Sequence, residues 1–221
     1  MKKVSGVIFD MDGLILDTEA IYSACNIEVA PDFGLDGYDL DKYREEIGLS
    51  ETHAFEKYLA DYPHLPKEAI EGFFNAGREK VLATFAKEGA PKKTGIVELL
   101  TYLNEHNIPC VVASSNNRQA VDHLITKANL QDYFKGTISG DDVTHAKPHP
   151  EIVEKAVAKL GTHPEETLML EDSLNGIRAS FTAGVPVIMV PDLLPPNEEA
   201  IEKSESIQKD LFDVLAFIQS V

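Results

Sequence analysis

The stretch Val7-Ile8-Phe9-Asp10-Met11-Asp12-Gly13 is an apolar run that ends in two carboxylates and a glycine. A short apolar run of this kind predicts a buried β-strand. Side chains two residues apart lie on the same side of an extended chain, so Asp10 and Asp12 face one crevice at the strand's carboxyl end. Gly13 allows a sharp turn there. Two adjacent carboxylates repel each other unless a cation or a shared proton intervenes. Alone, the pattern fits an Asp-rich turn equally well.

Downstream of residue 95, helical and strand patterns alternate. Helices are expected at about 96–106, 118–128, 150–160, 174–183 and 208–219, and strands at 110–113, 136–139, 167–170 and 187–190. Strands that alternate with helices connect by right-handed crossovers into a mostly parallel sheet, covered on both faces. The predicted fold class is therefore α/β.

Residues 18–87 interrupt this alternation with helical patterns alone. Helices are expected at 18–29, 40–47, 51–61 and 67–87, with Thr18 as a candidate N-cap. The predicted organisation is an α/β catalytic core formed by residues 1–16 and 88–221, and an inserted all-helical cap at 17–87. Because two short connectors join them, we expect the cap to move as a lid.

Composition excludes several classes of function. The formal net charge of −17 argues against nucleic acid and anionic membranes as partners, although a local cation still permits an anionic substrate. No apolar segment is long enough to span a bilayer, and the N-terminus lacks the apolar segment of a signal peptide. The two cysteines show no disulfide or metal spacing. We expect a cytoplasmic protein and a monomer.

Polar residues follow four of the predicted strands, and ligands of open parallel sheets bind at those carboxyl ends. The four sets are Asp10/Asp12, Ser114/Ser115/Asn116, Asp141/Asp142 and Glu171/Asp172. Each set alone is also explained by a turn or a helix cap. Together, carboxylate oxygens from Asp10 and Asp172 suit Mg²⁺, and the helix after residue 117 could accept a phosphoryl group. Lys147 would supply the positive charge that phosphoryl transfer requires, although a single lysine is more often exposed.

In the order and spacing of these motifs, the chain resembles the haloacid dehalogenase-like (HAD) hydrolase superfamily over nearly its whole length. The motif D-x-D-G is Asp10-Met11-Asp12-Gly13, the serine after the second strand is Ser114, the lysine is Lys147 in A-K-P-H-P-E, and the acidic pair is Glu171-Asp172. The helical insertion resembles the small cap of the β-phosphoglucomutase-like subfamily. The resemblance implies a Rossmann-like core with a cap domain.

The resemblance also implies catalytic roles. Asp10 would be the nucleophile that forms an aspartyl-phosphate. Asp12 would be the general acid and base, protonating the leaving oxygen and then activating water. Ser114 and Lys147 would hold the phosphoryl oxygens. Because a dehalogenation has no alkoxide to protonate, Asp12 favours phosphate esters over haloacids.

The metal implied by the resemblance is Mg²⁺. Its ligands would be the Asp10 carboxylate, the Asp12 backbone carbonyl and Asp172. Glu171 would order the water molecules around the ion. Ser115 and Asn116, which follow the serine motif directly, are candidate substrate-binding residues.

Further substrate contacts are expected from the cap, with Glu19 and Arg78 as candidates, although a solvated helix face is the commoner explanation for such residues. The family's cap loop corresponds to 47–51. Tyr22 stands where β-phosphoglucomutases place a histidine, and Glu51 stands where they carry an arginine. A bisphosphate intermediate needs a second cationic site, for which only Arg78 remains. We therefore expect a phosphatase that acts on a small phosphorylated metabolite such as a sugar phosphate.

Three alternatives stay open. A phosphomutase would return an isomerised product instead of phosphate. A signalling phosphoacceptor domain would keep a stable aspartyl-phosphate, but it explains neither an acid at position 12 nor the helical insertion. A non-catalytic binding protein could use the same fold, since a fold alone does not establish activity.

Overall fold

The computed structural model describes residues 3–47, 49 and 51–221. The chain divides into two compact units. One consists of Met1–Asp17 and Pro91–Val221, and the other of Thr18–Ala90. Among the described residues, no helix is both long and apolar enough to cross a membrane.

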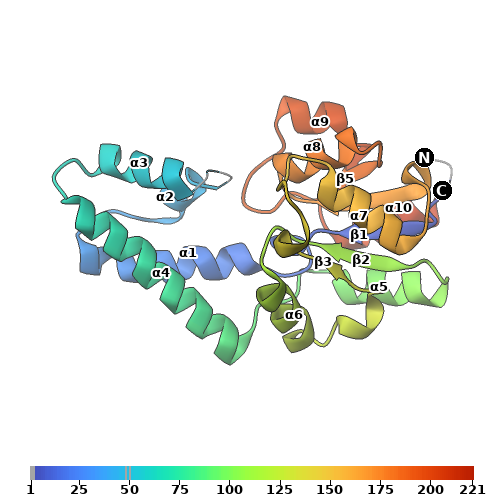
Figure 1. Ribbon diagram of the computed structural model, residues 1–221, viewed down its shortest axis with the longest axis horizontal. Helices are drawn as coiled ribbons and strands as arrows, with labels where there is room; N and C mark the ends of the chain where they lie inside the picture. Colours follow the sequence, from blue (N-terminus) through green and yellow to red (C-terminus); the bar gives the residue numbers. More distant parts are fainter. Residues whose placement is uncertain (1–2, 48, 50) are drawn as a thin grey trace. The chain divides into compact units, whose positions relative to one another are not determined.

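The first unit contains a six-stranded sheet in the order β3-β2-β1-β4-β5-β6 (Figure 1). All neighbouring strands are parallel, which confirms the predicted α/β class. The strands are β1 (Gly6–Phe9), β2 (Cys110–Ala113), β3 (Thr137–Ile138), β4 (Thr167–Glu171), β5 (Val187–Met189) and β6 (Ser206–Ile207). β1 lies between β2 and β4, so the Asp-x-Asp motif leaves the sheet at a central strand.

Helices surround this sheet, and all of them except α9 occur where the sequence pattern predicts a helix. They are α5 (Ile96–Glu105), α6 (Arg118–Lys127), α7 (Glu151–Leu160), α8 (Leu174–Thr182), α9 (Glu198–Lys203) and α10 (Leu211–Gln219). Ile8 of β1 packs in one apolar cluster with residues of α7 and α8. Its neighbours Val7 and Phe9 point to the opposite face and are also fully buried. Both faces of the sheet are therefore covered.

Two elements of the core were not predicted, namely α9 and β6. β6 has only two residues, which is too short for an apolar pattern, and it is defined by pairing with β5. α9 is a six-residue helix rich in glutamate, capped by the Asn197 side chain, which accepts from the Ala200 N–H at 2.8 Å. Both depend on tertiary contacts more than on local pattern.

The second unit is helical throughout its described residues. It contains α1 (Thr18–Val29), a 3₁₀ turn (Ala30–Phe33), α2 (Leu40–Arg44), α3 (Glu51–Asp61) and α4 (Lys67–Glu88). α1 packs along α4. The prediction that Thr18 caps α1 is wrong, because Thr18 lies in the first turn and its buried hydroxyl has no hydrogen-bond partner among the described residues.

The segments on either side of the helical unit are hydrogen-bonded to each other within the first unit. The Asp17 N–H donates to the Pro91 carbonyl at 2.8 Å, and the Lys93 N–H donates to the Ile15 carbonyl at 2.9 Å. This pairing fixes Lys93 close to the chain that leaves the Asp-x-Asp motif.

Candidate active site

The site begins where β1 ends. The Asp10 N–H donates to the Leu170 carbonyl at 3.0 Å, so Asp10 is still tied to the neighbouring strand β4. Gly13 then turns the chain with φ of +76°, a value that L side chains rarely adopt. A Cβ atom at Gly13 would also clash with the Asp172 carboxylate. Glycine is therefore required here both for the turn and for the close approach of Asp172.

Lys147 lies at the centre of the site and is not a surface residue. Its ammonium donates to Asp10 Oδ1 at 2.6 Å, to Glu171 Oε2 at 2.9 Å and to the Ala113 carbonyl at 3.1 Å. The Lys147 side chain is only 5% exposed. All three ammonium hydrogens thus have acceptors, which come from the ends of β1, β4 and β2.

Glu171 is held from two further sides. Its Oε1 accepts from the Ser173 hydroxyl at 2.7 Å and from the Ser173 N–H at 3.1 Å. A Cβ atom at Gly176, in the first turn of α8, would clash with the Glu171 carboxylate. Gly176 therefore belongs to the site architecture. The sequence offered a signal for it, since it lies in the same L-E-D-S-L-N-G-I motif.

The carboxylates of Asp10, Glu171 and Asp172 have oxygen atoms within 4.8 Å of one another. Burial, followed by the charge of Glu171, raises the pKa of Asp10 well above its usual range, although Lys147 opposes the shift. Burial also raises the pKa of Asp172, again with Glu171 as the next cause. For Lys147, burial lowers the pKa, but Asp10 and Glu171 outweigh it and the net pKa is raised.

This group contains three acidic side chains and one ammonium, so it carries excess negative charge in a buried place. Such a group is relieved by protons or by a cation. Several carboxylate oxygens at short mutual distance are the ligands that a hard divalent cation prefers. The donor set of Asp10, Glu171 and Asp172 therefore fits a metal site.

Asp12 has different neighbours from Asp10. Its Oδ2 accepts from Asn116 Nδ2 at 2.9 Å and from the Ser114 hydroxyl at 3.2 Å. The Asn116 N–H in turn donates to Ser114 Oγ at 3.1 Å. The structure thus brings Ser114 and Asn116 to Asp12. Ser115, between them, is exposed.

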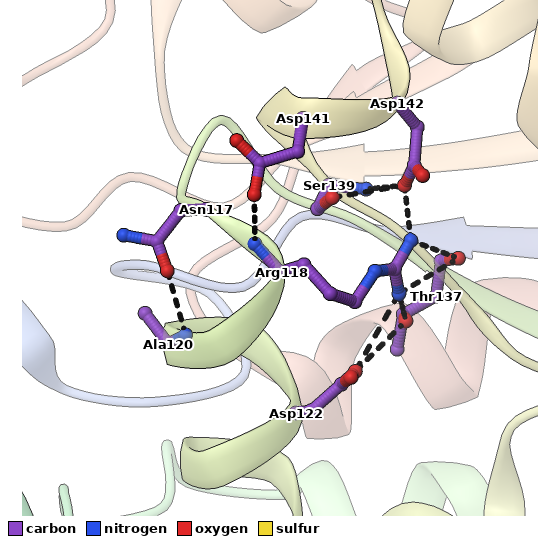
Figure 2. A network of polar contacts seen from close by, with 8 residues as sticks. All are labelled: Asn117, Arg118, Ala120, Asp122, Thr137, Ser139, Asp141 and Asp142. Atoms are coloured by element: carbon purple, nitrogen blue, oxygen red, sulfur yellow. Dashed lines mark hydrogen bonds and ion pairs between the residues drawn. The ribbon is translucent and has the colours of Figure 1, made fainter.

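Figure 2 shows that Asp141 and Asp142, which follow β3, contact Arg118 at the start of α6. Asp141 Oδ2 accepts from the Arg118 N–H at 2.8 Å, and the Arg118 guanidinium contacts Asp142. Asp142 Oδ2 also accepts from the Ser139 N–H at 2.7 Å. These contacts match the turn or helix-cap explanation that the sequence left open for this acidic pair.

The same network also involves the start of α6, where the sequence predicts an anion-binding site. The Arg118 N–H is bonded to Asp141, and the Ala120 N–H donates to the Asn117 side chain at 2.9 Å (Figure 2). Two of the amide groups in the first turn are therefore already occupied by side chains of the chain itself. A phosphoryl group would have to displace them to bind there.

Glu19 and Arg78, the candidate substrate-binding residues of the helical unit, remain predictions. Glu19 Oε2 accepts from the Tyr43 hydroxyl at 2.5 Å. Arg78 is exposed on α4. Gly48 and Ser50 of the predicted cap loop lie outside the described residues.

One acidic residue near the site was missed. Asp192 follows β5 and Pro191, at the same carboxyl edge as the other strand ends. Its Oδ1 accepts from the Lys93 ammonium at 2.6 Å. The rule that polar residues at the carboxyl ends of strands are candidate site residues also applies here, since Asp192 directly follows the apolar run and Pro191.

The sequence of this chain is similar to those of known proteins. A family model for haloacid dehalogenase-like hydrolases matches residues 7–190. This chain belongs to that family. It is 28% identical over 193 residues to hexitol phosphatase B of Escherichia coli K12, which covers 86% of this chain and 85% of the relative. It is 29% identical over 182 residues to a phosphorylated carbohydrates phosphatase of Thermotoga maritima, covering 82% of each.

Solved structures also resemble this chain. A crystal structure from Thermotoga maritima, assigned as a beta-phosphoglucomutase, matches with a TM-score of 0.81 and 26% identity, covering 99% of this chain and 100% of that one. The predicted family and the predicted hydrolase class are thus confirmed.

Proposed function

We propose that this protein is a Mg²⁺-dependent phosphatase that hydrolyses a small phosphorylated metabolite, such as a sugar phosphate, through an aspartyl-phosphate on Asp10. The observation that carries the proposal is the buried Lys147 ammonium, bonded at once to Asp10 and Glu171 beside Asp172. The names of the relatives, a hexitol phosphatase and a phosphorylated carbohydrates phosphatase, support the substrate class.

In the first step, a carboxylate oxygen of Asp10 attacks phosphorus and the bond from phosphorus to the ester oxygen breaks. Asp12 donates its proton to that oxygen, so the alcohol leaves neutral. The Lys147 ammonium lies 2.6 Å from Asp10 Oδ1, where negative charge accumulates on the phosphoryl oxygens during transfer. Ser114, whose hydroxyl can rotate, donates a further hydrogen bond.

In the second step, Asp12 accepts a proton from a water molecule, whose oxygen attacks the phosphorus of the aspartyl-phosphate. The bond between phosphorus and Asp10 breaks, phosphate leaves, and both aspartates return to their starting states. A covalent intermediate divides one very slow hydrolysis into two assisted steps.

Asp10, Asp172 and the Asp12 backbone carbonyl would hold Mg²⁺, with Glu171 ordering its water molecules. The ion would neutralise the carboxylates and offset the charge of the transferred phosphoryl group. The burial and excess negative charge of the carboxylate group support this assignment.

The test is phosphate release from an aryl phosphate and from a panel of sugar phosphates, in Mg²⁺ and in excess chelator. We expect Asp10→Asn to lower kcat by at least about a thousandfold, because the covalent route needs the carboxylate. Asp132→Asn, an exposed aspartate before the amino end of β3, is the control and should keep wild-type rates. Turnover of Asp10→Asn within tenfold of wild type would refute the mechanism, and full activity in chelator would refute the metal.

A phosphomutase is the second candidate, favoured by the structural match to a protein assigned as a beta-phosphoglucomutase. A bisphosphate intermediate needs a second cationic site. An isomerised sugar phosphate, formed without release of inorganic phosphate, would identify a mutase. A stable aspartyl-phosphate with no turnover would identify a signalling phosphoacceptor.

A further inference from the structure

Asp192 is a buried carboxylate with one oxygen bonded and the other not. Its side chain is 8% exposed. Oδ1 accepts from the Lys93 ammonium at 2.6 Å, whereas Oδ2 is buried and has no hydrogen-bond partner among the described residues. A buried polar atom without a partner destabilises the folded state, so native proteins almost always satisfy such atoms. We therefore expect a hydrogen-bond donor next to Asp192 Oδ2.

Asp192 Oδ2 lies close to Gly13, on the same side as the Asp172 carboxylate. A Cβ atom placed on Gly13 would be 3.1 Å from Asp192 Oδ2 and would clash with Asp172 Oδ2. The two carboxylate oxygens thus converge on one point beside the turn of the Asp-x-Asp motif. The charge of Asp192 also contributes to the raised pKa of Asp172, after burial, Glu171 and Asp10.

The backbone explains why Asp192 reaches this point. β5 lies beside β4, and beyond its end the Val190 N–H still donates to the Glu171 carbonyl at 2.8 Å. The chain therefore stays beside Glu171 for one residue beyond β5. Asp192 does not join the described carboxylates whose oxygens all lie within 4.8 Å of one another. It occupies a second layer around that group.

We propose that Asp192 is a positioning residue for the cation: its Oδ2 accepts a hydrogen bond from a water molecule in the hydration shell of the ion, while Lys93 holds Oδ1. Mg²⁺ keeps several of its water molecules in protein sites, and these are strong donors to outer carboxylates. The inference rests on the proposed function only in that a divalent cation binds at Asp10 and Asp172.

Lys93 makes this role specific. Its ammonium lies 2.6 Å from Asp192 and 3.7 Å from Asp17, and its side chain is 23% exposed. The ion pair with Lys93 offsets the negative charge of Asp192 beside Asp172. The Lys93 ammonium donates to Oδ1, and Oδ2 has no hydrogen-bond partner among the described residues.

The experiment measures Mg²⁺ affinity by titration calorimetry on chelator-treated protein, without substrate. We expect Asp192→Asn to raise the Kd for Mg²⁺ about tenfold, the lower end for loss of an outer-shell partner. The effect on Ca²⁺ should be smaller, because Ca²⁺ takes more ligands directly and depends less on bound water. Asp132→Asn removes the same charge from an exposed position and should leave both affinities within twofold.

A second variant covers the case in which Asp192→Asn unfolds, since that change leaves Lys93 charged and without Asp192. The double variant Lys93→Met with Asp192→Leu removes both partners and keeps the net charge, which is tolerated better than the loss of one partner. It should fold and should also bind Mg²⁺ about tenfold more weakly. General electrostatics cannot explain that result.

Two outcomes would overturn the inference. A Kd for Mg²⁺ within twofold of wild type in either folded variant would mean that Asp192 only stabilises the fold. Equal weakening of Mg²⁺ and Ca²⁺ would mean that Asp192 is a direct ligand. Phosphatase activity is measured separately: wild-type hydrolysis with unchanged Mg²⁺ binding in the variants refutes this inference alone, whereas weakened binding with no hydrolysis by wild type refutes the proposed phosphatase alone.

Discussion

Replacing Lys147 by methionine tests the centre of the site. The change removes an ammonium that donates to Asp10, Glu171 and the Ala113 carbonyl while keeping most of the side-chain volume. Two hydrogen bonds to carboxylates contribute roughly 1.5–3 kcal/mol each and the neutral one about 1 kcal/mol. Protonation of a carboxylate recovers part of this, so we expect a loss of about 3–5 kcal/mol in the free energy of unfolding without metal.

The loss should depend on pH in a defined direction. Lys147 lowers the pKa of Asp10, so without it the pKa of Asp10 rises further. The folded variant then binds more protons than the folded wild-type protein at intermediate pH. Its stability relative to wild type should therefore fall as pH rises from about 5 to about 8. Mg²⁺ should restore part of the difference, because a ligand of the folded state stabilises it by mass action.

The assay is urea unfolding at pH 5 and pH 8, with chelator and with Mg²⁺, together with kcat on an aryl phosphate. Lys209→Met removes an exposed lysine ahead of α10 and should change stability by no more than about 0.5 kcal/mol. Adding Glu171→Gln to Lys147→Met removes one repelling charge and should regain stability at pH 8. A loss below 1 kcal/mol at both pH values, with kcat within tenfold of wild type, would refute the reasoning.

Two further predictions concern glycine 176 and the helical unit. Gly176→Ala should destabilise the protein by about 1–3 kcal/mol and lower kcat, because the new methyl group clashes with Glu171; a gain of about 1 kcal/mol in urea unfolding, the usual effect in helices, would contradict this. Glu46 accepts from Tyr58 at 2.6 Å, and burial raises its pKa, so its contribution to stability falls as pH rises above the unfolded value. Glu46→Gln should therefore raise Tm relative to wild type more at pH 8 than at pH 4, and the opposite order would refute the assignment.

The strands that carry the site were predictable because each is a short apolar run followed by a polar residue. The burial of Lys147 was not, since its three acceptors come from strands that are far apart in the sequence. Local pattern assigns a lysine to the surface unless the partners are known. Family resemblance supplied that information, and geometry then gave it a physical reason.

The ambiguity at the strand ends has one physical origin. A polar residue at the carboxyl end of a strand can bind a ligand or bind its own chain, and the sequence does not distinguish the two. Asp142 is taken by Arg118 and Ser139, whereas Asp192 keeps one oxygen unbonded. Each aspartate contacts a cation that is distant along the chain: Arg118 for Asp142 and Lys93 for Asp192. Local sequence pattern does not show these contacts.

The strand order explains how one motif supplies two aspartates with different chemistry. β1 lies between β2 and β4, so the chain that leaves it has a different neighbour on each side. Asp10 is tied to β4 and contacts the Lys147 ammonium, which favours an ionised nucleophile. Asp12 accepts hydrogen bonds from the Ser114 hydroxyl and the Asn116 amide, two neutral donors that follow β2. Such donors can hold a carboxyl group in either charge state, which suits the proposed role of Asp12 as general acid and base. The proposed division of roles is consistent with this strand order, because it places the two aspartates beside different neighbours.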